Sequence, residues 1–228
     1  MRSIKLGAAA AALVLGALAL APSSTTASLS RGAPVPAGSE AQVSSELARA
    51  GTELRARLNS MNNSGAVGSA EVTVRHRRLT VDVDVHRVLA DMPHAMHIHF
   101  GKQARHECPT VARDDHNGDF RIETAEGLDA YGPVRVSFTT RGPTGKGSVL
   151  AVNRFPTAPR GQIHYDRHMR AGSRVAAGIR NGDAVVVVHG VDYNGNGKYD
   201  FRGGGRSDLD PELPAEATDP AACGVLRH

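Results

Sequence analysis

The chain has 228 residues, of which 40% are hydrophobic and 22% charged, and these proportions exclude a disordered chain, a collagen and a coiled coil. Its 27 Lys and Arg against 23 Asp and Glu give a formal net charge of +4, which is too small for a nucleic-acid-binding surface. The chain has no Trp, four Tyr and five Phe, so it also lacks the aromatic side chains on which single strands stack. We therefore expect one globular domain with extra segments and no nucleic-acid partner.

Residues 1–27 have the layout of a secretory signal peptide, with Arg2 and Lys5 before an apolar run of about fifteen residues and small residues before a cleavage site after Ala27. A membrane anchor is the alternative, but the run is shorter than the ~20 residues of a spanning helix, and no second apolar run follows. We expect a secreted, extracellular protein with no membrane span once the signal is removed. In that compartment Cys108 and Cys223, the only cysteines, can form a disulfide in one way.

Residues 28–38 are small, polar and rich in proline, and this composition predicts a linker. An amphipathic helix is predicted over residues 39–63. Its apolar residues recur at steps of four, three, four and four, at Val43, Leu47, Ala50, Leu54 and Leu58. We expect this helix to pack on the following domain, with binding of a partner protein as the alternative.

The apolar period changes to two in residues 64–228, first across a hairpin with strands around residues 70–74 and 79–85. Further strands are predicted at 96–100, 134–140, 149–152, 162–166 and 184–188, and one short helix at 173–181. Many short strands, frequent turns and few helices predict an all-β domain, a Greek-key β-barrel or sandwich with long loops.

The histidines of the segment HAMHIH are the clearest chemical signal. Residues two apart on a strand share a face, so His97 and His99 would present two imidazoles side by side. A third, His189, ends the apolar strand AVVVVH. Three imidazoles suit copper or zinc, and copper binds more tightly at equal geometry. Ordinary hydrogen-bonded histidines are the alternative. His164 and His168 are interpreted as surface residues.

These segments, together with VVVHG and the late ACGV, resemble Cu,Zn superoxide dismutases. The resemblance covers roughly residues 65–228 and implies a Greek-key barrel, copper ligation by His97, His99 and His189, and a bridge between Cys108 and Cys223 that ties a loop to the last strand.

The chain also departs from that family. The segment after Cys108 lacks the family's zinc ligands, so we expect no zinc site, and His116 is the one candidate for a fourth copper ligand. Pro220 stands where the family has an arginine that guides superoxide. These departures, together with the segment VVHGVDYNGNGKYD, are more similar to CHRD domains, which are secreted relatives of the dismutases.

Two acidic loops have the oxygen spacing of calcium-binding loops, with a hydrogen-bonded turn rich in Asp and Asn as the alternative. The first has Phe120 where a glycine is usual, and its predicted ligands are Asp115, Asn117, Asp119, the backbone of Arg121, Glu123 and Glu126. The second would need a further carboxylate from outside the loop, with Asp208 and Asp210 as candidates, and its predicted ligands are Asp192, Asn194, Asn196, Lys198 (through its backbone) and Asp200.

Two functions therefore remain open. The first is a secreted metal-binding module, with copper at the three histidines and calcium at the loops, and with weak or no catalysis. The second is an extracellular copper-dependent superoxide dismutase, with superoxide as its substrate. Loss of the arginine and of the zinc ligands favours the first.

Overall fold

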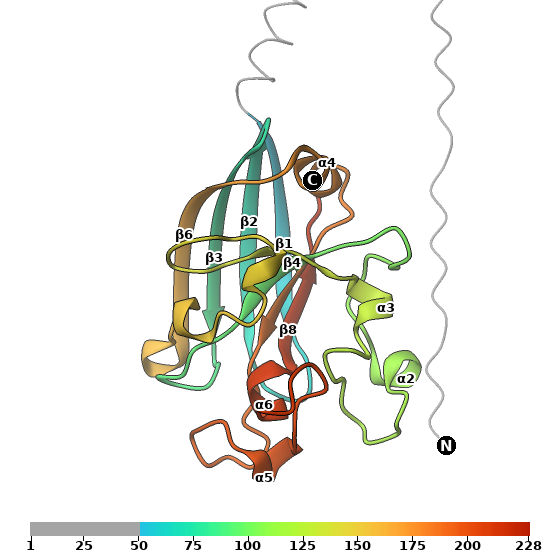
Figure 1. The fold of residues 1–228 in the computed structure, drawn as a ribbon, viewed down its shortest axis with the longest axis vertical. Helices are drawn as coiled ribbons and strands as arrows, with labels where there is room; N and C mark the ends of the chain where they lie inside the picture. The colour runs from blue at the N-terminus through green and yellow to red at the C-terminus, as the bar shows by residue number, and fades with distance from the viewer. Residues whose placement is uncertain (1–50) are drawn as a thin grey trace, which may run out of the picture. The chain divides into compact units, whose positions relative to one another are not determined.

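Residues 51–228 are described by the computed structural model of this chain, so the predicted signal peptide, the linker and residues 39–50 lie outside the described part. Eight strands form one antiparallel sheet in the order β5-β4-β7-β8-β1-β2-β3-β6 (Figure 1). The strands are β1 (Thr52–Ser60), β2 (Val67–Arg75), β3 (Arg78–His86), β4 (Met96–His99), β5 (Val134–Ser137), β6 (Gln162–Arg170), β7 (Val185–His189) and β8 (Pro220–Val225).

The helices are short and lie in the connections between strands. They are α2 (Val111–Asp114), α3 (Leu128–Tyr131), α4 (Ser173–Arg180), α5 (Phe201–Gly204) and α6 (Ala215–Thr218), with three 3-10 turns, η1 (Lys146–Ser148), η2 (Val152–Arg154) and η3 (Pro159–Gly161). Helix α4 confirms the helix predicted at 173–181. No helix within residues 51–228 is long and apolar enough to cross a membrane.

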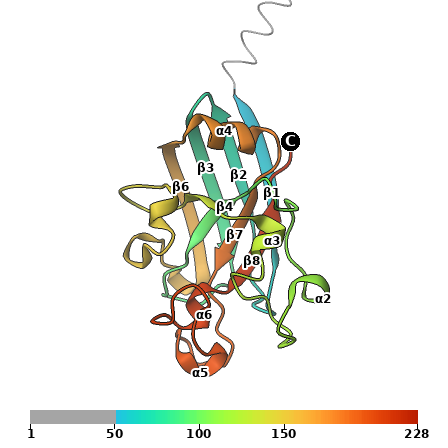
Figure 2. The same ribbon diagram turned by 45° about the vertical axis from the view of Figure 1, so that its right-hand side comes forward.

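The sheet curls into two layers, one of β1, β2, β3 and β6 and the other of β4, β5, β7 and β8 (Figures 1 and 2). The two edge strands approach each other through side chains just beyond β5, because the Phe138 ring stacks on the Tyr165 ring at 5.5 Å and the Tyr165 hydroxyl donates to the Thr139 carbonyl. The crossings from β3 to β4 and from β6 to β7 make the connections of a Greek key. The all-β prediction is confirmed.

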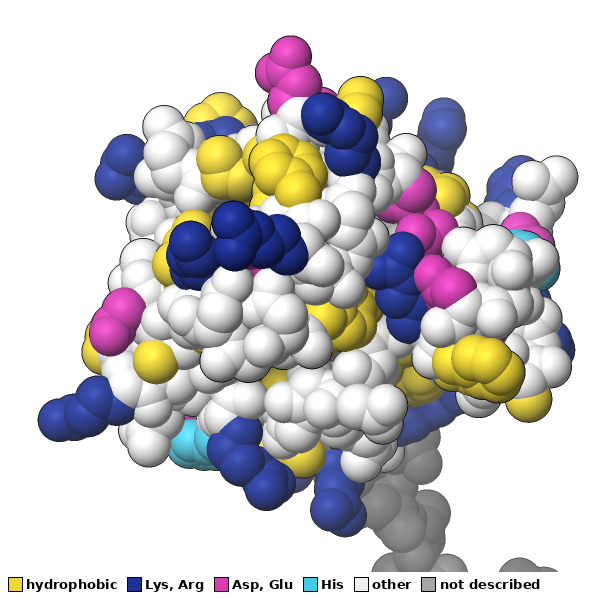
Figure 3. Space-filling view, turned by 90° about the horizontal axis from the view of Figure 1, so that it is seen from below, with side chains coloured by type: hydrophobic (Ala, Val, Ile, Leu, Met, Phe, Trp, Pro, Cys, Tyr) yellow, Lys and Arg dark blue, Asp and Glu magenta, His cyan; other side chains and the backbone are white. Residues whose placement is uncertain are grey.

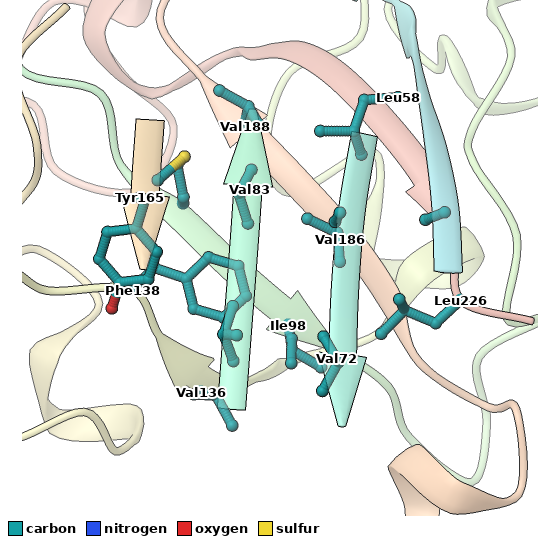
Figure 4. Packing of buried hydrophobic residues seen from close by; sticks show 14 of the residues in the cluster. Leu58, Val72, Val83, Ile98, Val136, Phe138, Tyr165, Val186, Val188 and Leu226 are labelled. Atoms are coloured by element: carbon teal, nitrogen blue, oxygen red, sulfur yellow. The ribbon is translucent and has the colours of Figure 1, made fainter. Parts of the chain in front are cut away.

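The core lies between the two layers. Alternate residues of β1, β2, β3, β4 and β7 point into it, as the period of two requires, and Figure 4 shows Val72 and Val83 of the first layer facing Ile98, Val186 and Val188 of the second. The predicted hairpin is confirmed by the pairing of β2 with β3 in continuous register from Val67–His86 to Arg75–Arg78.

The helix predicted over residues 39–63 is wrong for residues 51–63, the part of that range that the structure describes. Residues 52–60 form strand β1, in which Leu54, Ala56 and Leu58 are buried and the residues between them are exposed. Leucines four residues apart fit both a helix face and a strand face, so their spacing could not separate the two structures. Pairing with β2 over seven residues decides the local structure in favour of the strand.

The strand predicted at 149–152 is also absent. These residues lead from η1 into η2. Backbone amides there bond to carbonyls only two or three residues earlier, as in a turn, and the amide of Ala151, for example, donates to the carbonyl of Ser148 at 3.2 Å. Val149 and Leu150 instead contribute to a cavity over the second layer.

Candidate metal centre

His97, His99 and His189 lie together on the outer face of the pair β4–β7. Antiparallel register places His97 opposite Val187 and His99 opposite Val185, while His189 ends β7 on the same face. One ring nitrogen from each of the three side chains lies within 4.8 Å of the other two. Each residue is at most 3% exposed. The structure therefore brings together the three histidines that the sequence predicts as one group.

Backbone carbonyls fix the orientation of two of these rings. Nδ1 of His99 donates to the carbonyl of Gly132 at 2.8 Å, and Nδ1 of His189 donates to the carbonyl of Thr218. Because Nδ1 holds the proton, Nε2 of each ring presents a lone pair. Within residues 51–228 neither Nε2 atom has a hydrogen-bond partner, and neither nitrogen of His97 has a partner in hydrogen-bond geometry, although the backbone of Val149 interacts with its ring.

Two glycines allow this arrangement. Gly132 has a φ of +82°, and a Cβ there would lie 2.8 Å from backbone atoms of residues 100 and 101, so a side chain would displace the carbonyl that holds His99. Gly190 follows His189 with a φ of +112°, and a Cβ there would lie 2.7 Å from Nδ1 of His94. The ring of His94 lies between two carbonyls, with Nδ1 2.8 Å from that of His189 and Nε2 2.9 Å from that of Leu89, and it thus supports the end of β7.

Burial keeps the three imidazoles neutral. Loss of hydration lowers the pKa of His99 to about 3 and that of His189 to about 4, and the neighbouring His189 adds to the effect on His99. Burial, followed by the charges of His189 and His99, lowers the pKa of His97 well below its ordinary value. Near neutral pH all three side chains are therefore in the state that binds a metal ion.

A metal ion fits this donor set. Buried polar atoms normally have partners, and leaving them without one is unfavourable by roughly 1–3 kcal/mol each. Four ring nitrogens of these histidines lack partners in residues 51–228, and one nitrogen of each ring lies within 4.8 Å of the other two. Neutral imidazoles held by carbonyls through the other nitrogen are typical ligands of copper and zinc.

His116 is not part of this group. It is exposed in the first acidic loop, where its backbone amide donates to Glu126 at 2.9 Å. The loop folds around its own carboxylates and holds His116 there, so the structure does not support its role as a fourth copper ligand.

His164 and His168 are exposed on β6, and Nδ1 of His164 lies 2.8 Å from Asp84, on the opposite side of the sheet from the core.

The disulfide joins Cys108 to Cys223, as predicted, across 115 residues of sequence. Cys223 lies in β8 opposite Val187, so the bridge fastens the β4–β5 connection over the outer face of the second layer. The same connection contains α3, and the ring of its Tyr131 packs against that of His99 with centroids 4.5 Å apart. The cover of the histidines is thereby covalently attached to the sheet.

The first acidic loop is organised around two carboxylates. Asp115 accepts the amides of Gly118, Asp119 and Phe120, while Glu126 accepts those of His116 and Glu123 at 2.9 Å each. Phe120 has a φ of +65°, the conformation for which glycine is usual at this position. The side chain of Arg121 pairs with Asp119 and Glu123, which the prediction counts as ligands.

The second acidic loop repeats this pattern with a glutamate from another segment. Asp192 accepts the amide of Gly197 at 2.8 Å, and Glu216 of α6 accepts those of Tyr193 and Asp200 at 2.9 and 2.7 Å. These are the second and ninth residues of the loop, the same two that Glu126 holds in the first.

Neither predicted outside carboxylate occupies that place. Asp208 accepts the amide of Ala125, which belongs to the other loop, and Asp210 accepts that of Glu212. Neither loop gathers three metal-binding side chains as closely as the histidines do, so calcium binding stays a prediction.

A cavity of about 420 Å³ opens over the three histidines. Two basic residues, Arg135 and Lys146, line it. Arg135 lies in the strand predicted at 134–140, but the prediction of the metal site included neither residue. They come from β5 and η1, which the β4–β5 and β5–β6 connections bring over β4 and β7. Their distance in sequence from the histidine segments left no local signal.

No family model matches the chain, and no curated protein matches it. Among solved structures, superoxide dismutase 5 of Candida albicans in its Cu(II) form is 13% identical, with a TM-score of 0.37 over 77% of this chain and 91% of that chain. A variant of the same dismutase is 12% identical, with a TM-score of 0.38 over 77% of this chain and 88% of that chain. At these values the likeness does not establish the family of the chain.

Proposed function

We propose that this chain is an exported protein similar to the superoxide dismutases and CHRD domains, and that it binds one copper ion through His97, His99 and His189. The observation that supports the proposal is the convergence of three buried imidazoles from two strands, each with at least one nitrogen that lacks a hydrogen-bond partner in residues 51–228. The disulfide between Cys108 and Cys223 is in keeping with an oxidising, extracellular location.

The choice of copper follows from the donor atoms. Imidazole binds copper and zinc, and a site of given geometry holds Cu²⁺ more tightly than Zn²⁺. Copper would supply one-electron exchange at this site. The chain itself contributes the carbonyls of Gly132 and Thr218, which hold the Nδ1 protons of His99 and His189, and the rings of Phe155 and Tyr131, which pack on His97 and His99.

Binding with weak or no turnover is the function we favour. Pro220, which replaces the arginine expected from the dismutase motif, is buried in β8 and has no charge with which to attract an anion.

Superoxide dismutation is the second candidate, and one observation favours it. Arg135 and Lys146 line the cavity above the histidines, and no Asp or Glu is among its lining residues. Positive side chains at the mouth of a site raise the rate at which anions enter. These two residues could therefore take over the attraction of superoxide in the absence of an arginine at position 220.

A copper titration tests the proposal. Metal-free protein should bind one Cu(II) per chain, and its paramagnetic resonance spectrum should show nitrogen ligands. His189→Ala should abolish this spectrum. His164→Ala should leave it unchanged, because His164 is exposed on the far layer. Failure to bind copper at a metal-to-protein ratio of one, or loss of the spectrum in both variants, would overturn the proposal.

Dismutation is tested on the copper-loaded protein. If it is a dismutase guided by Arg135 and Lys146, the rate should fall as salt is raised, and Lys146→Met should lower the rate at low salt. If copper is bound without turnover, the rate should equal that of the His189→Ala protein at every ionic strength.

A further inference from the structure

The cavity over the histidines has an unusual wall. Seven large hydrophobic side chains are exposed within residues 51–228, and four of them line this one cavity: Leu128, Leu150, Val152 and Leu209. They come from α3, the η1–η2 segment and the α5–α6 connection, so three separate connections supply them. Exposed apolar side chains are normally scattered, and their collection around one opening indicates a binding surface.

The size of the cavity suits an organic molecule. Its volume of about 420 Å³ lies in the range of roughly 300–1,000 Å³ that is typical of small-molecule sites. A diatomic anion or a single water would fill a small part of it. Phe155, Val149 and Leu213 add further apolar surface to the wall.

The charges in the cavity have one sign. Arg135 and Lys146 line it, and its lining residues include no carboxylate. Neither basic side chain forms an ion pair with any carboxylate of the described chain. Arg135 is held in place, since its Nε donates to the carbonyl of Phe100 at 2.8 Å and its guanidinium lies over the Phe100 ring. An acidic group on the ligand would therefore find two cations without competing partners.

The shape of the surface agrees with this description. Figure 3 shows the molecule from the end where α5 and α6 lie, and near the centre of this view hydrophobic side chains lie in a recess beside Lys or Arg side chains. The combination of an apolar wall and unpaired positive charge matches a molecule with an apolar body and one acidic group.

We propose that this cavity binds a small amphipathic anion, an alkyl or aryl carboxylate, whose apolar part contacts Leu128, Leu150, Val152 and Leu209 and whose acidic group pairs with Lys146 or Arg135. The inference deepens the proposed function, because it concerns the ligand that reaches the same three histidines, but it can be tested without metal.

The test is calorimetric titration of the metal-free, full-length protein with linear carboxylates from butanoate to decanoate, and with the neutral alcohols of the same length. Affinity should rise about threefold to fourfold for each added methylene until the cavity is filled. Each carboxylate should bind severalfold more tightly than its alcohol. Affinity that does not grow with chain length, or alcohols that bind as tightly as carboxylates, would overturn the proposal.

Matched variants locate the site. Val152→Asn should weaken binding of every ligand at least fivefold, whereas Val111→Asn should not, because Val111 is 39% exposed outside the cavity and Val152 is 46% exposed in its wall. Lys146→Met should reduce the affinity for carboxylates alone, while Lys102→Met, an exposed lysine outside the cavity, should have no effect. Equal effects in either matched pair would contradict the site.

Two further outcomes separate this inference from the metal proposal. Binding of one copper without any carboxylate would leave the proposed function standing and remove this inference. Carboxylate binding by a protein that takes up no copper would do the reverse. Sedimentation at the same concentrations gives a third result: if the chain dimerises and the carboxylates compete with the dimer, the wall is an interface between copies, and the inference fails.

Discussion

The two faces of the pair β4–β7 bury side chains of opposite kinds. On the inner face Met96, Ile98, Val186 and Val188 are fully buried in the apolar core. On the outer face, one residue away along the same strands, buried imidazole nitrogens lack partners. The inner face therefore stabilises the fold, whereas the outer face reduces the stability of the metal-free protein and holds the groups that can bind a metal.

Substitution of Ile98 should give the largest effect on the inner face. Ile98→Ala removes side-chain atoms from the core and should lower the free energy of unfolding by about 3–4 kcal/mol. Urea denaturation measures this loss. The stoichiometry of copper binding should remain one per chain under native conditions, because His97 and His99 point away from the core. A loss below 1 kcal/mol would contradict the assignment of Ile98 to a closely packed site.

Acidification should lower the free energy of unfolding through the histidines of the outer face. The unfolded chain takes up protons on histidine below pH 6.5, whereas folded His99 and His189, with pKa values of about 3 and 4, do not. The unfolded state therefore binds more protons, and stability falls by roughly 2 kcal/mol for each of these residues between pH 7 and pH 5.

Asp219 acts in the opposite direction. Burial raises the pKa of its carboxyl to about 7, so the folded state gains a proton between pH 7 and pH 5 and the unfolded state does not, which adds roughly 2 kcal/mol of stability. Burial also lowers the pKa of His97, which adds to the loss caused by His99 and His189. Denaturation of the metal-free protein should thus show a net loss of stability, and Asp219→Asn should make that loss larger by roughly 2 kcal/mol. Equal losses in the two proteins would refute this balance.

An apolar substitution at His97 should make the outer face as favourable to folding as the inner one. His97→Leu replaces a buried ring with two unpartnered nitrogens by an apolar side chain, and should raise the free energy of unfolding of the metal-free protein by roughly 1–3 kcal/mol. The same variant should lose copper binding. Destabilisation by more than 1 kcal/mol would show that His97 has a packing role that its lack of partners does not suggest.

The smallest expected effect concerns the two acidic loops, which belong to the connections between strands and to neither face of the sheet. With an affinity typical of extracellular calcium sites, 1 mM calcium should raise the free energy of unfolding by roughly 1 kcal/mol. Glu126→Gln and Glu216→Gln should each reduce this gain, and Asp210→Asn should leave it intact. Denaturation curves that coincide with and without calcium would remove both loops as calcium sites.

Local patterns in the sequence predicted the parts of the structure that short-range geometry determines. The alternation of His97, Ile98 and His99 on a strand, the hairpin, and helix α4 all follow from spacing within a few residues. The helix predicted over residues 39–63 failed across residues 52–60, because Leu54 and Leu58 fit both periods and the partner strand that decides between them begins only at Val67, nine residues after Leu58.

The cavity and the second loop depend on contacts between distant segments. Lys146 and Arg135 reach the histidines only through the folding of long connections, and Glu216 meets Tyr193 from 23 residues away. Nothing in the local sequence of these residues distinguishes them from ordinary surface charges. Their roles follow from tertiary packing, which a single sequence read in short windows does not contain.

The junction between β5 and β6 has a consequence for the behaviour of the protein at high concentration. Within residues 51–228 strand β6 pairs only with β3, so its other edge could accept a strand from a second molecule. The guanidinium of Arg167 and the hydroxyl of Tyr165 instead bind the carbonyl of Thr139, and exposed polar side chains, including those of Asp166 and Arg170, alternate with more buried residues along the strand. Charge and side-chain cover of this kind oppose edge-to-edge polymerisation, so the open side of the sheet is protected from fibre-like aggregation without a ninth strand.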